Sequence, residues 1–376
     1  MRILAANAGS TIHKYTALAA AALVLNGPAA ATKENGMASE VTGADSASGS
    51  GRVQLDLQTR TTGSFAGCLQ PALRATGVDW SLEHLRGYLG PAFAFSMEPG
   101  GGRLSQAENY EWHHFYGMLD FLEHESVSVA LKGVIAVPPE EHDAAKARGW
   151  EMVRRALDDG YPAIVWQAMT LETKQSGRRP IPFLWSLITG YDEEAGTYSA
   201  HHGAAGDFTI GWDAFGHSDP VNWFCIMVFR PLTEPFDGAA ASRKAVEQAL
   251  EASRGERPGV RAPAHGLAAW EMWLQAFRDG TVDVPAVGGH AAFLIEARRA
   301  AATYLRDVEP HFPETARAAL GTAADSYDRV AARISELRAL CAADEPDLPR
   351  AAEVLATALE AESAALALLQ QALDAN

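Results

Sequence analysis

The sequence predicts an α+β domain followed by an all-α domain, and two observations support this assignment. After the N-terminal segment, helical patterns are followed by strand-like runs joined by short turns, which is the layout of an α+β fold. From about Pro235 onward the strand signals vanish, and Ala, Leu, Glu and Arg dominate the composition. We therefore expect an N-terminal extension and linker at 1–52, an α+β domain at 53–235 and an α-helical domain at 236–376.

The composition is that of a soluble globular protein with enough residues for two hydrophobic cores. The chain has 376 residues, of which 48% are hydrophobic and 21% are charged. The net charge is −16 and no run of Lys and Arg occurs, which argues against nucleic acid and anionic membranes as partners. The three cysteines are widely spaced and odd in number, which fits reduced thiols in the cytosol better than a disulfide framework.

The N-terminal segment has two interpretations. Residues 15–25 form an apolar run of signal-peptide length, and small residues suitable for cleavage follow it. The same residues also fit a helix that is capped by Ser10 and stopped at 26–28, after a short strand. The apolar run is too short to span a bilayer. We expect a cytoplasmic protein, with export through a signal peptide ending near residue 31 as the alternative.

The predicted α+β domain begins after a linker at 38–52, which is rich in Ser, Gly and Ala and has no apolar periodicity. Helical patterns cover residues 68–75, 82–89, 109–124 and 144–158. Strand-like runs cover residues 127–137, 161–169, 182–192, 197–202 and 222–231. The segments DEEAG and GAAGD between the later strands are typical of hairpin turns.

The predicted helical domain contains four amphipathic helices. The first is GLAAWEMWLQAFRDG, which ends at a glycine and places three aromatic residues on one face: Trp270, Trp273 and Phe277. The second is HAAFLIEARRAAATYLRDV, the third covers residues 316–340 and the fourth covers 349–373. The third helix carries a core stripe at helical spacing, made of Tyr327, Val330, Ile334 and Leu337. We expect these helices to form a bundle, which could also carry a homodimer interface.

Four stretches of the block at 53–232 are characteristic of one protein family. They are LQPALRATGVDWS, GPAFAFSM, ALDDGYPAIVWQ and LWSLITGYDEEAGTYSAHH, in this order. Through them the block resembles the papain-like fold of C39-type peptidases, and more closely the N-terminal domain of butirosin-biosynthesis H-type acyltransferases. The resemblance covers about half of the chain, and an all-α domain after such a block is also usual in relatives. It implies a papain-like, C39-like domain at 53–235.

In such enzymes a cysteine opens the first long helix, whose N-terminus lowers the pKa of the thiol, and a histidine on a later strand takes the proton. The family's cysteine lies about thirteen residues before the glycine that ends this helix, and the same count from Gly77 gives Ser64. The family's histidine lies about six residues before the glycine of the GYD motif, and the same count from Gly190 gives Leu184. Both catalytic positions depart from the family pattern, and Asp192 is placed to cap a turn rather than to orient an imidazole.

Cys68 has two interpretations. It lies one turn inside the predicted helix, where a cysteine is commonly a small, buried and unreactive residue. A shift of register would instead make Cys68 the nucleophile, with His201 or His202 on a following strand as its base. Three tryptophans of the same block are candidates for lining a papain-type cleft: Trp112, Trp166 and Trp185.

The sequence gives no support for a metal or a cofactor. The chain has 12 histidines, and two pairs are adjacent, at 113–114 and 201–202. Adjacent side chains diverge on a helix and face opposite sides of a strand, so neither pair can chelate one ion alone. His113, Asp120 and His124 fall on one face of the predicted helix but far apart along it, and neither HExxH nor CxxC occurs. We expect no metal site and no cofactor.

The sequence therefore predicts a degenerate member of this family, which binds a small or peptide-like ligand in a papain-type cleft without thiol catalysis. The alternative is a cysteine-dependent acyltransferase or amide hydrolase that uses Cys68 in a biosynthetic pathway. An acyl group bound to a carrier protein is a further candidate ligand under this alternative.

Overall fold

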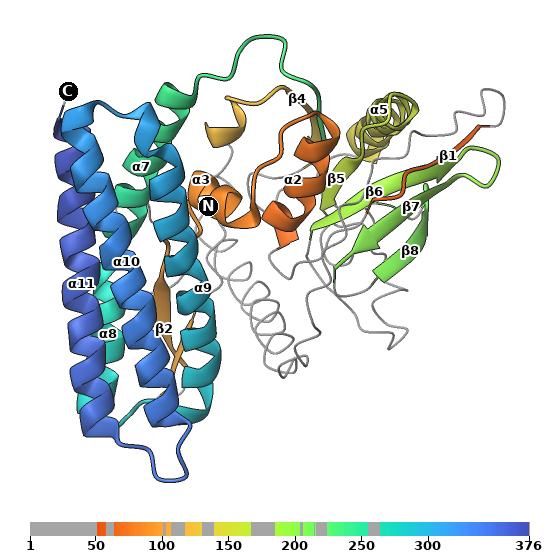
Figure 1. The fold of residues 1–376 in the computed structure, drawn as a ribbon. Coiled ribbons are helices and arrows are strands. Elements are labelled where there is room, and N and C mark those ends of the chain that lie inside the picture. Colours follow the sequence, from red (N-terminus) through yellow and green to blue (C-terminus); the bar gives the residue numbers. More distant parts are fainter. Residues whose placement is uncertain are drawn as a thin grey trace, which may run out of the picture. The chain divides into compact units, whose positions relative to one another are not determined.

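The computed structural model describes residues 51–57, 64–100, 103–106, 117–129, 139–166, 185–203, 206–213, 215, 224–254 and 264–375. These residues belong to two compact units, and each is described by itself (Figure 1). The first unit takes the described residues up to Asp79 and those of Glu123–Thr233. The second unit takes the described residues of Trp80–Leu122 and Glu234–Asn376.

An antiparallel sheet of seven strands is the centre of the first unit. The strand order is β4-β9-β5-β6-β7-β8, and β1 pairs with the last residues of β6. The strands are β1 (Arg52–Gln54), β4 (His124–Val129), β5 (Ala163–Trp166), β6 (Trp185–Asp192), β7 (Thr197–His202), β8 (Gly206–Gly211) and β9 (Phe224–Phe229). The described helices of this unit are α2 (Ser64–Ala75) and α5 (Pro139–Asp158). The predicted combination of helices and strands, with a helical C-terminal part, is confirmed at this level.

α5 and α2 pack on opposite faces of the sheet. The face under α5 carries alternate side chains of the strands, among them Val165, Ile188 and Ile226, which share one core with the apolar residues of α5. The intervening side chains, among them Trp166 and Leu187, point to the other face, where α2 packs on β5, β6 and β9. The sheet is therefore covered from both sides in its middle.

β6 has two different neighbours along one of its edges. Its first residues pair with β5 and its last residues pair with β1. On the edge toward β7 the register shifts between Ile188 and Gly190. Glycine is needed at position 190, because a Cβ atom there would lie 2.5 Å from the carbonyl oxygen of Val53 in β1.

The second unit combines helices with a small sheet. Its helices are α3 (Leu82–Leu89), α7 (Gly238–Arg254), α8 (Leu267–Arg278), α9 (Val284–Val308), α10 (Glu314–Cys341) and α11 (Leu348–Asp374), with a 3-10 turn η1 (Glu309–His311). The small sheet has the order β10-β2-β3, from β2 (Ser96–Gly100), β3 (Arg103–Gln106) and β10 (Ala264–His265). The four predicted helices are confirmed as α8 to α11. None of the described helices has the length and apolarity that a membrane crossing needs.

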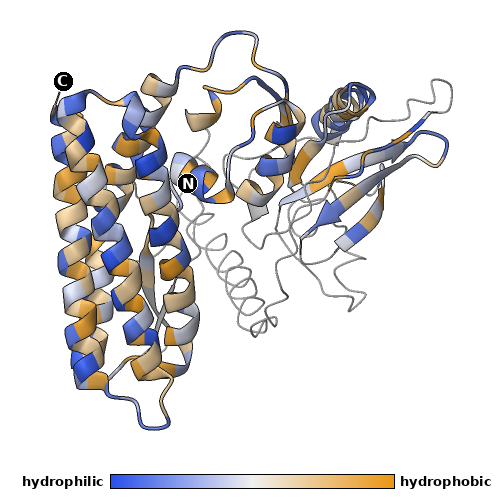
Figure 2. Ribbon diagram, in the orientation of Figure 1, coloured by the Kyte–Doolittle hydropathy of each residue, from blue (hydrophilic) through white to orange (hydrophobic). Residues whose placement is uncertain are grey.

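The apolar faces of the helices α8 to α11 form one core. The predicted aromatic face of α8 is buried in it, and so are three residues of the predicted stripe of α10: Trp270, Trp273, Phe277, Val330, Ile334 and Leu337. Tyr327, the fourth residue of that stripe, is buried beside Phe93 and the guanidinium of Arg298. Figure 2 shows hydrophobic residues alternating with hydrophilic ones along these helices, which is the pattern of amphipathic helices that bury one side. Burial of these faces is the main stabilising contribution to this unit.

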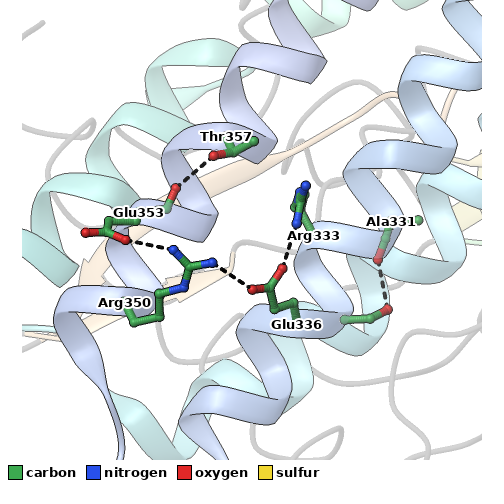
Figure 3. Close-up of polar contacts among 7 residues, drawn as sticks. Ala331, Arg333, Glu336, Arg350, Glu353 and Thr357 are labelled. Atoms are coloured by element: carbon green, nitrogen blue, oxygen red, sulfur yellow. Dashed lines mark hydrogen bonds and ion pairs between the residues drawn. The ribbon is translucent and has the colours of Figure 1, made fainter.

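A capped break and exposed ion pairs connect α10 to α11. The Asp347 carboxylate accepts a hydrogen bond from the backbone N–H of Arg350, which caps the start of α11 as the predicted break requires. The Arg350 guanidinium lies 2.8 Å from Glu353 and 3.3 Å from Glu336 of α10, and Arg333 lies 2.8 Å from Glu336 (Figure 3). These side chains are exposed, so the network contributes little to stability.

The described residues of Trp80–Leu122 pack in the second unit, whereas the domain prediction placed them in the α+β domain. Close packing explains the difference. A Cβ atom on Gly87 of α3 would clash with Tyr304 of α9, so the glycine allows these two helices to touch. The strand β2, which follows α3, pairs with β10, which lies far from it in the sequence. Composition along the sequence carries no information on such contacts.

The helix predicted at 109–124 does not reach His124. The described part of this segment ends in a turn, and His124 begins β4 opposite Phe229 of β9. The sequence HESVSV alternates along its length, which suits a strand paired on one edge. His113 lies outside the described residues. Because Asp120 is in the turn and His124 is in a strand, their predicted place on one helix face is wrong.

Arg298 of α9 and Glu362 of α11 form a buried ion pair in the second unit. Two contacts of 2.8 and 2.7 Å join the guanidinium to the carboxylate, and the side chains are 0% and 1% exposed. A third guanidinium N–H donates to the backbone carbonyl of Ala92 at 2.6 Å. The rings of Trp270 and Tyr327 lie 5.7 and 5.9 Å from the guanidinium carbon. Because neither side chain is exposed to water, each charge is stabilised by the opposite charge of its partner.

We expect Glu362→Gln to lower the free energy of unfolding by about 3–5 kcal/mol, because it leaves the Arg298 guanidinium buried without its counter-ion. The double replacement of Arg298→Met with Glu362→Leu removes both charges, so most of the loss should be recovered. Urea unfolding of the full chain, followed by tryptophan fluorescence, measures both variants. Equal losses in the single and the double variant would contradict this account.

Candidate functional site

The first turn of α2 packs on the start of β6. Phe65 meets Trp185 edge-on with ring centroids 4.8 Å apart, and Trp185 lies 5.5 Å from Trp166. The local sequence favours this helix, because buried apolar residues recur at helical spacing: Phe65, Cys68, Leu69, Ala72 and Leu73. The helix ends before Gly77, which has a positive φ and donates its N–H to the carbonyl of Arg74.

Cys68 lies in the packing between α2 and the sheet. Its residue is 1% exposed, and burial raises the pKa of its thiol well above the ordinary value. The thiol is therefore protonated at neutral pH, whereas a cysteine nucleophile must ionise and reach its substrate. This environment is that of a structural thiol, and Cys225 and Cys341 are likewise buried.

His201 and Asp207 form a hydrogen-bonded pair across the β7–β8 hairpin. They are direct partners in the strand register, and Nδ1 of His201 lies 2.7 Å from Oδ1 of Asp207. His201 is 8% exposed, whereas the Asp207 side chain is 82% exposed. When Nδ1–H donates to the carboxylate, Nε2 is the acceptor of the neutral ring. The pair thus has the arrangement of a histidine base and the carboxylate that orients it.

The His201–Asp207 pair lies on the face of the sheet that α2 covers. His201 is the register partner of Leu187, and Leu187 shares a face with Trp185 because side chains alternate along β6. β6 and β7 run antiparallel, so the start of β6 lies beside the end of β7. The first turn of α2 and the His201–Asp207 pair are therefore at the same end of the same face.

His202 points to the opposite face of the sheet, because it follows His201 directly in β7. Its side chain is buried, and this burial, with the nearby His201 adding to it, lowers the pKa of His202 to about 4. The ring is therefore neutral at physiological pH. The two histidines that the sequence offered as bases cannot serve one site, since the sheet separates them.

Beyond α2 the same face of the sheet becomes polar. The register partners Ser199 and Thr209 lie beside His201 and Asp207 on it, and these four residues are called the polar face. Asp207 and Thr209 are exposed. The covered, apolar part of the face under α2 thus passes into a polar part on β7 and β8, with His201 at the border. Two hydroxyls, an imidazole and a carboxylate can hold a ligand there by hydrogen bonds.

The structure places the remaining predicted site residues as follows. Asp192 ends β6 and caps the turn after it, as predicted, because Oδ1 accepts a hydrogen bond from the N–H of Ala195 at 2.9 Å. Ser64 is the first residue of α2. Trp166 and Trp185 are buried at the end of the sheet. Two further predicted residues lie outside the described part of the chain: Leu184 and Trp112.

The sequence analysis did not identify Asp207 as the partner of His201, although the signal was present. Once GAAGD is a hairpin turn after the strand at 197–202, the register of the hairpin sets Asp207 opposite His201. Within the described ranges, no group of three or more His, Cys, Asp or Glu side chains is placed to hold a metal ion.

Comparisons with known proteins add no family to these observations. No protein-family model matches the chain. A search of curated proteins finds no match either. The chemistry of the site is therefore argued from its own residues.

We expect iodoacetamide to label Cys68 only after unfolding, because the buried thiol is both protonated and inaccessible. Peptide mass spectrometry of the alkylated native protein at several pH values measures this rate, and the same protein in urea gives the reference rate. Fast labelling of the native protein, with an apparent pKa below the free-thiol value of about 8.5, would show an activated thiolate instead.

The buried His202 ring should make the first unit sensitive to acid. Its pKa is about 4 in the folded chain against an ordinary value of 6.5, so the unfolded chain takes up the proton first. The free energy of unfolding should therefore fall as the pH is lowered from 6.5 toward 4. Urea titrations across this pH range, on the native chain and on His202→Gln, measure how much of the pH dependence of the free energy of unfolding comes from His202. An identical slope in both proteins would argue against it.

Proposed function

We propose that the first unit is a degenerate papain-like domain that binds a small or peptide-like ligand on the polar face, without thiol catalysis. One observation carries this proposal. Cys68 is buried with a raised pKa, whereas the polar face reaches solvent through Asp207 and Thr209. Thiol catalysis needs an ionised and accessible sulfur, and ligand binding needs neither.

The arrangement of elements supports the papain-like part of the proposal. A helix precedes most strands of an antiparallel sheet, and a histidine–carboxylate pair lies on the face that this helix packs on, toward the same end of the sheet as the first turn of the helix. Ser64 begins the helix at the position where the family resemblance places a cysteine. The domain thus keeps the general plan of such enzymes without their sulfur at the helix start.

The side chains of the polar face fit a ligand that carries amide or ammonium groups. The Asp207 carboxylate accepts hydrogen bonds and carries a negative charge, and the hydroxyls of Ser199 and Thr209 both donate and accept. His201 adds a ring that can do either, depending on its proton. A peptide offers the matching set, because each of its amide units brings one donor and one acceptor.

One observation favours an alternative function. His201 lies on the same face as α2, so a state in which α2 shifts on the sheet could bring Cys68 toward a base. That state would support a cysteine-dependent acyltransferase or amide hydrolase, with a thioester on Cys68 as the intermediate. It requires Cys68 to leave its buried position.

A thermal-shift and native mass spectrometry screen tests the proposal on the full chain. The panel contains dipeptide amides and acyl-pantetheine thioesters. A ligand of the polar face should raise the melting temperature of the native chain and of Cys68→Ala equally, because a bound ligand stabilises through its affinity alone. Asp207→Asn should weaken the same shift. Glu194→Gln, which changes an exposed carboxylate of the neighbouring β6–β7 turn, is the matched control and should not.

Two results would contradict the proposal. One is a panel in which nothing shifts the melting temperature at millimolar concentration. The other is an acyl adduct on Cys68, detected by mass, together with product formation that Cys68→Ala abolishes. The second result would establish the alternative function.

A further inference from the structure

Among the described strands, β8 is the last one on its side of the seven-stranded sheet. The strand order ends at β8, and β7 is its single partner among the described strands. Natural sheets commonly protect such edges with Lys, Pro or a β-bulge. β8 reads GDFTIG, with neither Lys nor Pro, and its register with β7 runs through six consecutive pairs without a shift. This edge is therefore suited to receive another strand.

The opposite edge of the sheet differs from β8. β4 carries Glu125, which faces two arginines: Arg155 of α5 at 3.4 Å and Arg230 after β9 at 3.9 Å. The charge of Glu125 is therefore already paired within the unit. β8 has no such ion pair among the described contacts apart from that of Asp207 with His201.

The hydrogen-bond pattern of the hairpin shows which backbone groups β8 offers. The N–H of Trp212 donates to the carbonyl of Gly196 at 2.8 Å, one position beyond the last register pair of the two strands. Hydrogen-bonded and non-hydrogen-bonded pairs alternate in an antiparallel ladder. Asp207, Thr209 and Gly211 are therefore in non-hydrogen-bonded pairs with β7. Their N–H and C=O groups point away from β7. Those of Asp207 and Thr209 face the edge of the sheet, whereas the carbonyl of Gly211 accepts a hydrogen bond from the N–H of Phe215 at 3.0 Å.

The side chains at this edge indicate which strand it would accept. Asp207 and Thr209 both lie on the polar face, so a residue opposite Asp207 in an added strand would have its side chain on that face too. Asp207 is 82% exposed and negative, which favours Lys or Arg at that position. The net charge of −16 favours a basic partner as well, and it opposes pairing with a second copy of this chain.

We propose that β8 binds an extended, basic peptide by strand addition, with a Lys or Arg side chain opposite Asp207. This inference rests on the proposed function and names its ligand class. The peptide bonds to the outward N–H and C=O groups of Asp207 and Thr209, and its basic side chain lies beside the carboxylate that holds His201. The backbone contacts give affinity, and Asp207 gives the preference for charge.

Fluorescence anisotropy on the full chain tests this proposal, with a labelled peptide of alternating threonine and lysine as the probe. We expect saturable binding that is lost when the alternate amides facing β8 are N-methylated. Thr209→Pro should weaken binding at least about tenfold, because it removes an outward N–H and blocks the edge. This substitution removes no hydrogen bond between β8 and β7. Thr209→Ala removes the hydroxyl that the polar face offers but keeps the N–H, so it should weaken binding clearly less than Thr209→Pro.

Charge is tested separately from strand addition. Asp207→Asn should reduce the affinity for the lysine peptide and leave the affinity for a peptide of alternating threonine and glutamine nearly unchanged. Unchanged thermal melting of Thr209→Pro verifies that this variant is folded. If Thr209→Pro melts at a lower temperature than the native chain, strand addition is tested by N-methylation of the probe instead. Loss of binding on N-methylation supports strand addition without any change in the protein.

Three outcomes would overturn the proposal: no saturable binding, equal binding by Thr209→Pro and Thr209→Ala, or a dimer of the native chain that sedimentation finds absent in Thr209→Pro. The third would assign the edge to a second copy. A ligand that depends on Asp207 but not on the N–H of Thr209 would leave the proposed function intact and remove only strand addition. Peptide binding that depends on both Asp207 and the N–H of Thr209, found together with an acyl adduct on Cys68, would support strand addition and contradict the proposed function.

Discussion

The packing of α2 on the start of β6 is the constraint on which the candidate site depends. Because Phe65 is held against Trp185, the following apolar positions of the helix are carried onto the sheet, and Cys68 with them. The described contacts of α2 are with β5, β6 and β9, and the strands β7 and β8 carry polar side chains on this face. One contact thus removes the thiol from water and leaves a histidine–carboxylate pair at the border of the covered area.

The register of the β7–β8 hairpin decides which polar groups meet at that border. A slip of one residue would turn His201 toward α5 and bring His202 to the face of α2. The opposite face prevents this slip, because Tyr198 and Ile210 are register partners there and both are buried in the core with α5. An apolar pair on one face of the hairpin therefore fixes the polar pair on the other, which is how core packing positions a candidate site it does not touch.

Sequence patterns predicted the structure that depends on neighbouring residues, but they did not predict the contacts between residues far apart in the chain. The spacing of apolar residues was sufficient for α8 to α11, and GAAGD was sufficient for the hairpin turn, because both depend on neighbouring residues. The segment before His124 was predicted to be helical, yet pairing with β9 made the residues from His124 onward a strand. The contact of Gly87 with Tyr304 and the pairing of Arg298 with Glu362 each join residues far apart in the chain, and no local pattern encodes them.

The two ion pairs also differ in whether they leave a charged group that a ligand can reach. Arg298 and Glu362 are both buried and satisfy each other, so that pair serves the specificity of the helical unit and has no charge to offer. In the first unit His201 is buried while its partner Asp207 is exposed, so a solvent-facing charge is coupled to a buried ring. A basic group that binds Asp207 would share this carboxylate with the ring of His201. The exposed carboxylate therefore leaves a charge in the first unit that a basic ligand can reach, which the buried pair of the second unit does not.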